Sequence, residues 1–237
     1  MSPLCTSARE YIKMKSILFS CLIPEILDGT KTQTRRLVKF TKSVCATWDV
    51  KSSYDAYDVT PHHNRGTFGF LVAGDMGYAD VKCPYGVPGD LLYVKETWKP
   101  DPAWGQSNVS TKKLIPGDNI LYKATLDPQH PKYNTGKWRS PLFMPEWAAR
   151  IKIKIIDVRV ERLQDISDHD AKAEGVREPN IEFIGNKLDK YHTIMQKLGA
   201  GSHYKTGYKI IWDSLHTNDG NAWSKNPWVW VIDFKVV

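Results

Sequence analysis

The clearest fold signals lie at residues 15–38, KSILFSCLIPEILDGTKTQTRRLV. The apolar start of this segment, at 15–21, predicts a buried strand. Residues 23–28 predict a short helix, which Gly29 is placed to end. The β-branched residues of 32–38 favour a second strand. The segment therefore predicts a strand, a helix and a strand in close succession, as expected for an α+β protein.

Outside this segment the sequence favours short strands separated by turns. The stretch at 150–160, RIKIKIIDVRV, alternates apolar and charged residues and predicts a half-buried strand. Ser167 can cap a helix that runs to about Glu174, with Asp170 at the capping-box position. Capping explains the acidic residues at the start of this helix better than metal binding does. Further strands are expected at 67–72, 78–82, 91–97 and 228–236, and further helical segments at 145–149 and 204–215.

These elements predict one small β-barrel with short flanking helices and long loop insertions. The polar segment before Met14 shows no pattern, so residues 1–13 are expected to be a disordered extension of a single domain at 14–237. Polar, turn-rich stretches predict loop insertions at about 41–66 and 99–137. Hydrophobic residues make up 41% of the chain and charged residues 25%, which excludes a disordered chain.

The charge balance favours an acidic partner. The formal net charge is +7, and nine Trp and eleven Tyr offer rings on which bases can stack. The longest apolar stretch near the N-terminus, 17–23, is too short to span a bilayer, so we expect a cytoplasmic protein without membrane contact. We expect neither a metal nor another cofactor, because no CxxC pair occurs among the cysteines. These are Cys5, Cys21, Cys45 and Cys83.

Residues 29–36, GTKTQTRR, concentrate three cations and three hydroxyls. The guanidinium groups of Arg35 and Arg36 offer fixed forks for phosphate or a base edge. Lys31 could act as a base if burial lowered its pKa, and Thr34 could act as a nucleophile if its proton were removed. Alternatively, the cations only stabilise the negative end of the preceding helix. Side chains alternate along a strand, so Lys31 can approach Thr34 only from a turn before the strand.

These residues resemble the ASCH family of PUA-like proteins, which is frequent in bacteriophages and prophages. The family pattern GxKxxExR fits at Gly29, Lys31 and Arg36, with Thr34 where many members carry Glu. The matching pieces follow in order along the chain: KSILFSCLIPEILDGTKTQTRR, GDLLYVKETW, KWRSPLFMPEWAARI with DVRVERLQDIS, and NPWVWVIDF. The resemblance implies a PUA-like barrel, a cleft beside the GxK segment, and binding of RNA or of a modified nucleoside. For a phage protein it also implies a host protein as a possible partner.

The chain is more distantly similar to N(4)-acetylcytidine amidohydrolase, which removes an acetyl group from a modified nucleoside. This similarity implies that Lys31 is the base and Thr34 the nucleophile. The third residue of that enzyme, a Glu on a later strand, aligns with Lys154. Glu96 either takes its place beside Lys31 or Arg36, or forms an ordinary ion pair at a strand end. Hydrolysis is therefore an alternative to binding, as is a ribonuclease on the same scaffold.

A second group of candidate ligand-binding residues combines Arg with Trp. Arg139 and Arg150 flank the stretch at 138–147, and Arg interleaved with Trp suits base stacking and phosphate contacts. The alternative is a lid that packs on the barrel, with Arg covering the faces of Trp. The full set of expected ligand-binding residues is Gly29, Thr32, Arg35, Arg36, Trp98, Trp138, Arg139 and Arg150.

Overall fold

The computed structural model describes residues 14–39, 56–61, 66–72, 78–101, 110–111, 114–117, 119–177, 203–216 and 221–237. The expectations for residues 1–13 and for most of 41–66 lie outside these ranges. The described chain is α+β, as the sequence predicts. Its strands are β1 (Lys15–Leu18), β2 (Gln33–Leu37), β3 (Ala56–Pro61), β4 (Thr67–Val72), β5 (Tyr78–Lys82), β6 (Leu91–Lys95), β7 (Trp98–Pro100), β8 (Ile120–Tyr122), β9 (Lys152–Arg162) and β10 (Trp228–Val236). Its α-helices are α1 (Ile23–Leu27), α3 (Asp168–Ala173) and α5 (His203–His216), and its 3-10 helices are Pro141–Phe143, Glu146–Ala148, Leu163–Asp165 and Trp223–Lys225.

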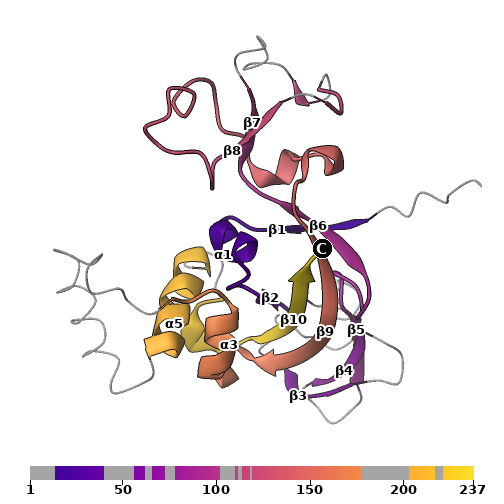
Figure 1. Ribbon diagram of the computed structural model, residues 1–237. Helices are drawn as coiled ribbons and strands as arrows, with labels where there is room; N and C mark the ends of the chain where they lie inside the picture. The colour runs from indigo at the N-terminus through magenta and orange to yellow at the C-terminus, as the bar shows by residue number, and fades with distance from the viewer. Residues whose placement is uncertain are drawn as a thin grey trace, which may run out of the picture.

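The main sheet has five strands in the order β1–β6–β9–β10–β2. β1 and β6 are parallel, and the other neighbouring pairs are antiparallel. Helices α3 and α5 lie on one side of this sheet, and the three-stranded sheet β3–β4–β5 lies on the other (Figure 1). β2 is an edge strand of the main sheet. No helix in the described ranges is long and apolar enough to cross a membrane.

Strand β10 is buried on both faces, because its side chains alternate between two cores. Trp230 faces the small sheet, where the rings of Phe68 and Phe70 meet it edge to face with centroids 5.3 and 6.4 Å away. Each such pair adds about 0.5–1.5 kcal/mol beyond the burial of its area. The next residue, Val231, faces the helices and packs in the core that contains Trp212. The strand expected at 228–236 is confirmed. It packs against the small sheet β3–β4–β5 on one face and against the helices on the other.

A β-bulge interrupts the pairing of β9 with β10. Ile155 and Asp157 pair with successive residues of β10, so Ile156 has no partner there and is half exposed. The extra residue lets Ile155 and Val158, three positions apart, both point into the same core. The doubled isoleucine in RIKIKIIDVRV is therefore the sequence trace of this bulge.

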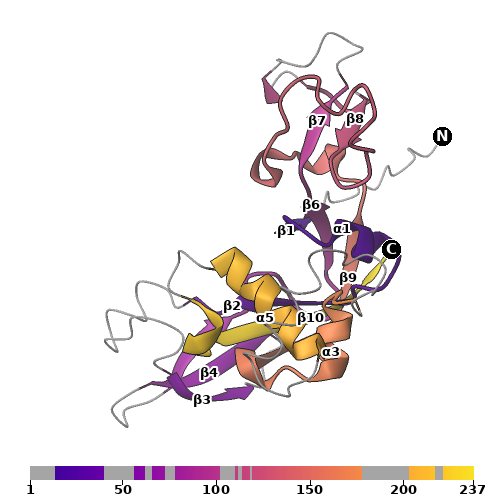
Figure 2. The ribbon, with the colours of Figure 1, turned by 90° about the vertical axis from the view of Figure 1, so that its left-hand side faces the viewer.

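Strands β7 and β8 belong to a small lobe beside the main sheet, the β7–β8 lobe, which comprises the described residues of 96–149 (Figure 2). The sequence predicts a loop insertion at 99–137, whereas the structure pairs β7 with β8 within it. This pairing forms because the lobe has a core of its own, in which Trp98 and Met144 are at most 1% exposed. β3 likewise lies inside the loop expected at 41–66. It is an edge strand, where the missing N–H of Pro61 is tolerated.

Candidate functional site

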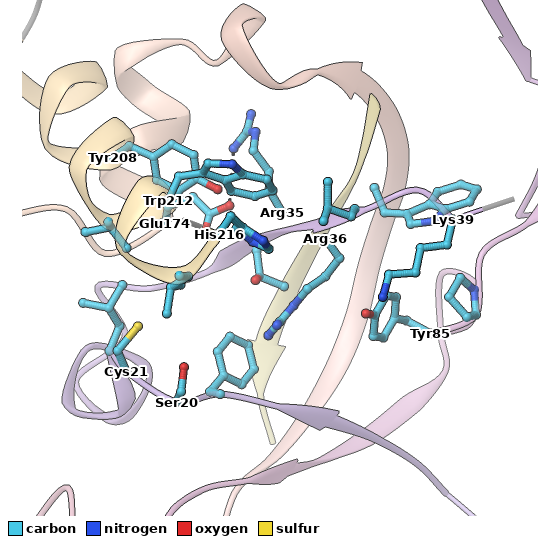
Figure 3. A pocket seen from close by; sticks show the side chains of 18 of the residues that line it. Ser20, Cys21, Arg35, Arg36, Lys39, Tyr85, Glu174, Tyr208, Trp212 and His216 are labelled. Carbon is cyan, nitrogen blue, oxygen red and sulfur yellow. Dashed lines mark ion pairs between the residues drawn. The ribbon is translucent and has the colours of Figure 1, made fainter. Parts of the chain in front are cut away.

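A pocket of about 730 Å³ lies beside the edge strand β2 (Figure 3). It is bounded by the connection between β1 and α1, by β2, by the turn after β5 and by α5. This volume suits a nucleoside or a nucleotide. The lining residues are Phe19, Ser20, Cys21, Leu22, Lys31, Thr34, Arg35, Arg36, Leu37, Lys39, Asp80, Val81, Lys82, Pro84, Tyr85, Glu174, Tyr208, Ile211, Trp212, Leu215, His216 and Trp230.

The path of the chain around α1 brings the GxK segment to this pocket. The chain leaves the main sheet after Phe19, and Leu22 takes a left-handed conformation with φ 59° just before α1. Gly29 ends the helical turn with φ 80°, which the missing Cβ permits, as the sequence predicts. Lys31 then lies just before β2. This is the position from which the alternation of strand side chains allows it to approach Thr34.

Lys31 and Glu174 form a buried ion pair in the pocket wall. The Lys31 side chain is 4% exposed, and its Nζ donates to Oε2 and to the main-chain carbonyl of Glu174, both at 2.6 Å. Burial lowers the pKa of Lys31, and the charge of Glu174 opposes this effect. Glu174 is followed by Gly175, where an added Cβ would lie 3.2 Å from the Cβ of Lys31. Glycine at this position therefore allows the end of α3 to approach Lys31.

Arg35 faces the helices and is held by carboxylates. Its Nη2 donates to Glu161 at 3.0 Å and to Asp170 at 3.2 Å, and its Nη1 lies 3.6 Å from Oε1 of Glu174. Burial alone would raise the pKa of Asp170, but a hydrogen bond from Gln33 and the charge of Arg35 outweigh it and lower this pKa. The amide of Asp170 also donates to the capping serine, as expected. Asp170 therefore has a second role besides its place in the helix cap, because its carboxylate binds Arg35 and Gln33 behind the pocket.

Arg36 points away from Arg35 and is half buried in the pocket wall. Its Nη2 donates to the carbonyl of Leu18 at 2.6 Å, and its guanidinium lies 4.7 Å from the ring centroid of Phe19. Figure 3 shows Arg36 in the middle of the pocket and Lys39 on the side away from Glu174. The described residues of the lining include five cations and two carboxylates, and two further carboxylates, Glu161 and Asp170, bind Arg35 from outside the lining. The cations are Lys31, Arg35, Arg36, Lys39 and Lys82, and the carboxylates of the lining are Asp80 and Glu174.

Aromatic rings form the pocket wall on the side of α5. Trp212 and His216 stack with their centroids 4.2 Å apart. Tyr208 is buried beside them, and this burial raises its pKa well above the ordinary value, with the negative charge of Glu174 adding to the shift. Tyr85 lies on the opposite side of the pocket (Figure 3), and burial raises its pKa as well. Rings and cations around one cavity suit a planar base that carries a phosphate.

The structure brings some of the predicted site residues together and separates others. Those that line the pocket are Lys31, Thr34, Arg35 and Arg36. Glu96 is placed elsewhere, 1% exposed, and it accepts two hydrogen bonds from Arg150, at 2.8 and 2.9 Å. This is the ion-pair alternative that the sequence left open for Glu96. The carboxylate beside Lys31 is that of Glu174, because the end of α3 lies against the GxK segment.

The predicted Arg and Trp residues of 138–147 lie in the β7–β8 lobe. Trp98 is fully buried in the core of this lobe, and the guanidinium of Arg139 lies 5.2 Å from its ring centroid. The ring of Trp138 is 4.2 Å from the ammonium of Lys99. Arg therefore covers a Trp face, as the lid alternative expected, but this stretch packs on its own lobe and contributes nothing to the lining of the pocket.

The remaining predicted residues shape the backbone near the pocket or lie away from it. The amide of Thr32 donates to the carbonyl of Ala173 at 2.8 Å and thereby ties β2 to α3, while its side chain is exposed. Gly29 forms the turn that precedes Lys31. Lys154, which aligns with the Glu of the amidohydrolase, lies on β9 opposite Leu91 and outside the pocket lining.

Sequence reasoning missed the residues that α3 and α5 contribute to the site. Glu174 had one usable signal, since it is a carboxylate followed by glycine at the end of a helix whose start was identified. Its pairing with Lys31 spans 143 positions, however, and no local pattern reports such a contact. Trp212 lies on a helix with an apolar side, where a core role is the usual interpretation.

Within the described ranges, no group of three or more His, Cys, Asp or Glu residues is arranged to hold a metal ion. The site therefore offers the Lys31–Glu174 ion pair, the hydroxyl of Thr34, further cations and aromatic rings. Comparisons of the chain with models of protein families, with curated proteins and with solved structures found no match. We therefore infer function from the chemistry of the pocket itself.

Proposed function

We propose that this chain binds nucleotide units, as in RNA, in the pocket beside β2, and that it is a member of the ASCH group of PUA-like proteins. The observation that carries the binding proposal is the pocket lining, whose described residues combine aromatic rings with five cations and two carboxylates around about 730 Å³. The family resemblance supports it, because the GxKxxTxR residues Lys31, Thr34 and Arg36 line this pocket. The five-stranded sheet and the sheet β3–β4–β5 pack around one core, and this packing supports the proposal of a PUA-like barrel.

The charges of the pocket are arranged in two zones. On the inner side, Lys31 and Arg35 are neutralised by Glu174 and by the carboxylates of the network around Asp170. Further along β2, the described contacts of Arg36 are with a main-chain carbonyl and an aromatic ring. An anion gains most beside Arg36, which pairs with no carboxylate among the described residues, because charge-assisted hydrogen bonds to a guanidinium are the strong ones. We therefore place the phosphate beside Arg36 and the base between the aromatic walls.

Titration with the 5′-monophosphates of the four common ribonucleosides tests this proposal, with tryptophan fluorescence as the signal, because Trp212 and Trp230 line the pocket. Arg36→Ala should weaken binding about 10- to 100-fold, the effect of losing one charge-assisted contact. The matched control is Arg162→Ala. Arg162 likewise donates to a main-chain carbonyl, at 3.1 Å, and lies 4.3 Å from the ring centroid of Trp228, but outside the pocket. Absence of binding, or equal losses in both variants, would overturn the proposal.

A second candidate function is hydrolysis of an acylated nucleoside, and the Lys31–Glu174 pair is the observation that favours it. Burial lowers the pKa of Lys31 and the charge of Glu174 opposes this effect, so this mechanism requires the neutral form of the amine, which can accept a proton. In this mechanism Lys31 removes the proton of Thr34 Oγ1, which attacks the acyl carbon of the amide. The C–N bond then breaks, the amine leaves with the proton from Lys31, and water later releases the acyl group from Thr34. Glu174 orients Lys31 throughout.

Thr34→Val separates the two functions, because it removes the hydroxyl while keeping a β-branched side chain suited to a strand. With N(4)-acetylcytidine as the probe, we expect turnover to disappear and nucleotide binding to persist. Thr206→Val is the matched control, since Thr206 is also buried, 7% exposed, but lies on α5 outside the pocket lining. Turnover that survives Thr34→Val would rule out this hydrolytic mechanism. If the parent protein shows no turnover, nucleotide binding remains as the one proposed function.

A further inference from the structure

A second hollow, of about 320 Å³, lies on the other side of the connection between β1 and α1. Four consecutive residues, 19–22, line both this side hollow and the main pocket. Such a stretch spans at most about 14 Å, so the two hollows are neighbours separated by one segment of chain. The other residues that line the side hollow are Ile23, Pro24, Thr97, Lys123, Ala124 and Tyr133.

The side hollow offers the two kinds of contact that characterise the main pocket, a cation and an aromatic ring. Lys123 is exposed, and no carboxylate is among the described residues that line this hollow. The main chain of Lys123 and the ring of Tyr133 are held in place by their surroundings. The amide of Lys123 donates to the carbonyl of Thr97 at 3.0 Å, and the ring centroid of Tyr133 lies 5.4 Å from that of Trp138. The carbonyl of Tyr133 also accepts a hydrogen bond from buried Lys99.

We propose, on the basis of the function proposed above, that the ligand is a single-stranded oligonucleotide with one nucleotide in each hollow. The phosphate that links them then passes over Ser20 and Cys21, which are exposed and belong to both linings. The hydroxyl of Ser20 can donate to that phosphate. Stacking on Tyr133 accepts any base, so the side hollow binds the neighbouring nucleotide whatever its sequence. A free nucleoside would use only the main pocket and would leave Lys123 without a role.

The test compares the four ribonucleoside 5′-monophosphates with the 5′-phosphorylated homodinucleotides of A, C, G and U. The best dinucleotide should bind at least about tenfold more tightly than its monophosphate, the contribution of one further stacked base and phosphate. Each neutralised phosphate of a single strand adds about 0.7 to the slope of log affinity against log salt concentration. Lys123→Glu should therefore reduce the gain in dinucleotide affinity and remove about 0.7 of this slope, while the stacking on Tyr133 and the monophosphate affinity stay unchanged.

Lys152→Glu is the matched control, because Lys152 is also exposed but lies on β9 and lines neither hollow. Lys152→Glu should leave unchanged the ratio of dinucleotide affinity to monophosphate affinity. Equal affinity for monophosphates and dinucleotides would overturn the two-hollow inference and leave the binding function standing. A loss of gain in Lys152→Glu as large as in Lys123→Glu would also overturn it, because the effect would then be one of overall charge. Failure of both ligand classes to bind would overturn the proposed function itself.

Discussion

Two lysines are buried in different parts of this molecule, and they are neutralised in different ways. Lys31, in the wall of the main pocket, donates to the carboxylate and the carbonyl of Glu174. Lys99, in the β7–β8 lobe, is 1% exposed and donates to the main-chain carbonyls of residues 132, 133 and 135 at 2.5, 2.9 and 2.7 Å. The ring of Trp138 covers it at 4.2 Å. Burial lowers the pKa of both lysines.

The comparison shows when a buried charge indicates a functional site. Both ammonium groups recover by hydrogen bonding part of what they lose by leaving water. The described hydrogen-bond partners of Lys99 are main-chain carbonyls, and among the described side chains the only carboxylate that acts on its charge is Asp101, without a hydrogen bond to it, so its charge mainly fixes the turns of the lobe. The partner of Lys31 is a titratable side chain, and both line a cavity. A buried cation therefore points to chemistry when its partner is a side chain and a cavity adjoins the pair.

Lys99→Met should cause the largest loss of stability, about 4 kcal/mol, because it leaves three main-chain carbonyls without their donor. A second substitution cannot remove these carbonyls, because they belong to the main chain. Urea denaturation followed by tryptophan fluorescence measures this loss. The matched control is Lys132→Met in the same lobe. The Lys132 side chain is 37% exposed, although its partner Asp101, at 2.6 Å, is buried, so its loss should be smaller, about 1–2 kcal/mol. Similar losses for the two variants would contradict a structural role for the carbonyls around Lys99.

Lys31→Met should cost somewhat less, about 3 kcal/mol, because Glu174 is left buried but still lies 3.6 Å from Arg35. Adding Glu174→Gln should recover most of this loss, since replacing both members of a buried pair is often nearly neutral. The double variant should nevertheless bind nucleotides poorly and hydrolyse nothing. A double-mutant cycle in urea, with the four proteins also tested for binding, checks both points. A double variant that loses stability as the sum of the single changes would show that the pair is not coupled.

Local signals explain which parts of this fold could be predicted. The strand at 228–236 and the helix capped by Ser167 were found because apolar periodicity and capping act over a few residues. The turn at Gly29 was found because a positive φ favours glycine. The β7–β8 pairing was missed, because its strands are three residues long and are stabilised by a core that only the folded lobe assembles.

The candidate site shows the same limit. The GxK segment supplied Lys31, Thr34 and Arg36, but it could not supply their carboxylate. The sequence offered Glu96 from the strand expected at 91–97, whereas the pocket receives Glu174 from the end of α3. Which carboxylate meets a lysine depends on how the sheet and helices pack. That contact is non-local and leaves no periodic trace in the sequence.

The smallest effect concerns acid, to which the carboxylate network around Arg35 in the pocket wall and the carbonyl environment of Lys99 should respond differently. Asp170→Asn removes a carboxylate that Arg35 and Gln33 bind, and should cost about 1–2 kcal/mol at pH 7. Because the folded pKa of Asp170 is lowered below 3.8, its stabilisation is present above the unfolded pKa and is lost as the pH falls through the folded value. The difference in unfolding free energy between the parent protein and Asp170→Asn should therefore shrink below about pH 4.

The control for this prediction is Asp168→Asn, an exposed change in the first turn of the same helix, which should cost less at pH 7. The carbonyl oxygens that bind Lys99 do not titrate in this range, and Asp101 acts on Lys99 through its charge alone, so the penalty of Lys99→Met should shrink less than that of Asp170→Asn. Urea denaturation of all four proteins between pH 7 and pH 3 makes the comparison. If both penalties fell in parallel, acid would be acting on the whole fold, and the distinction between side-chain and main-chain neutralisation would not hold.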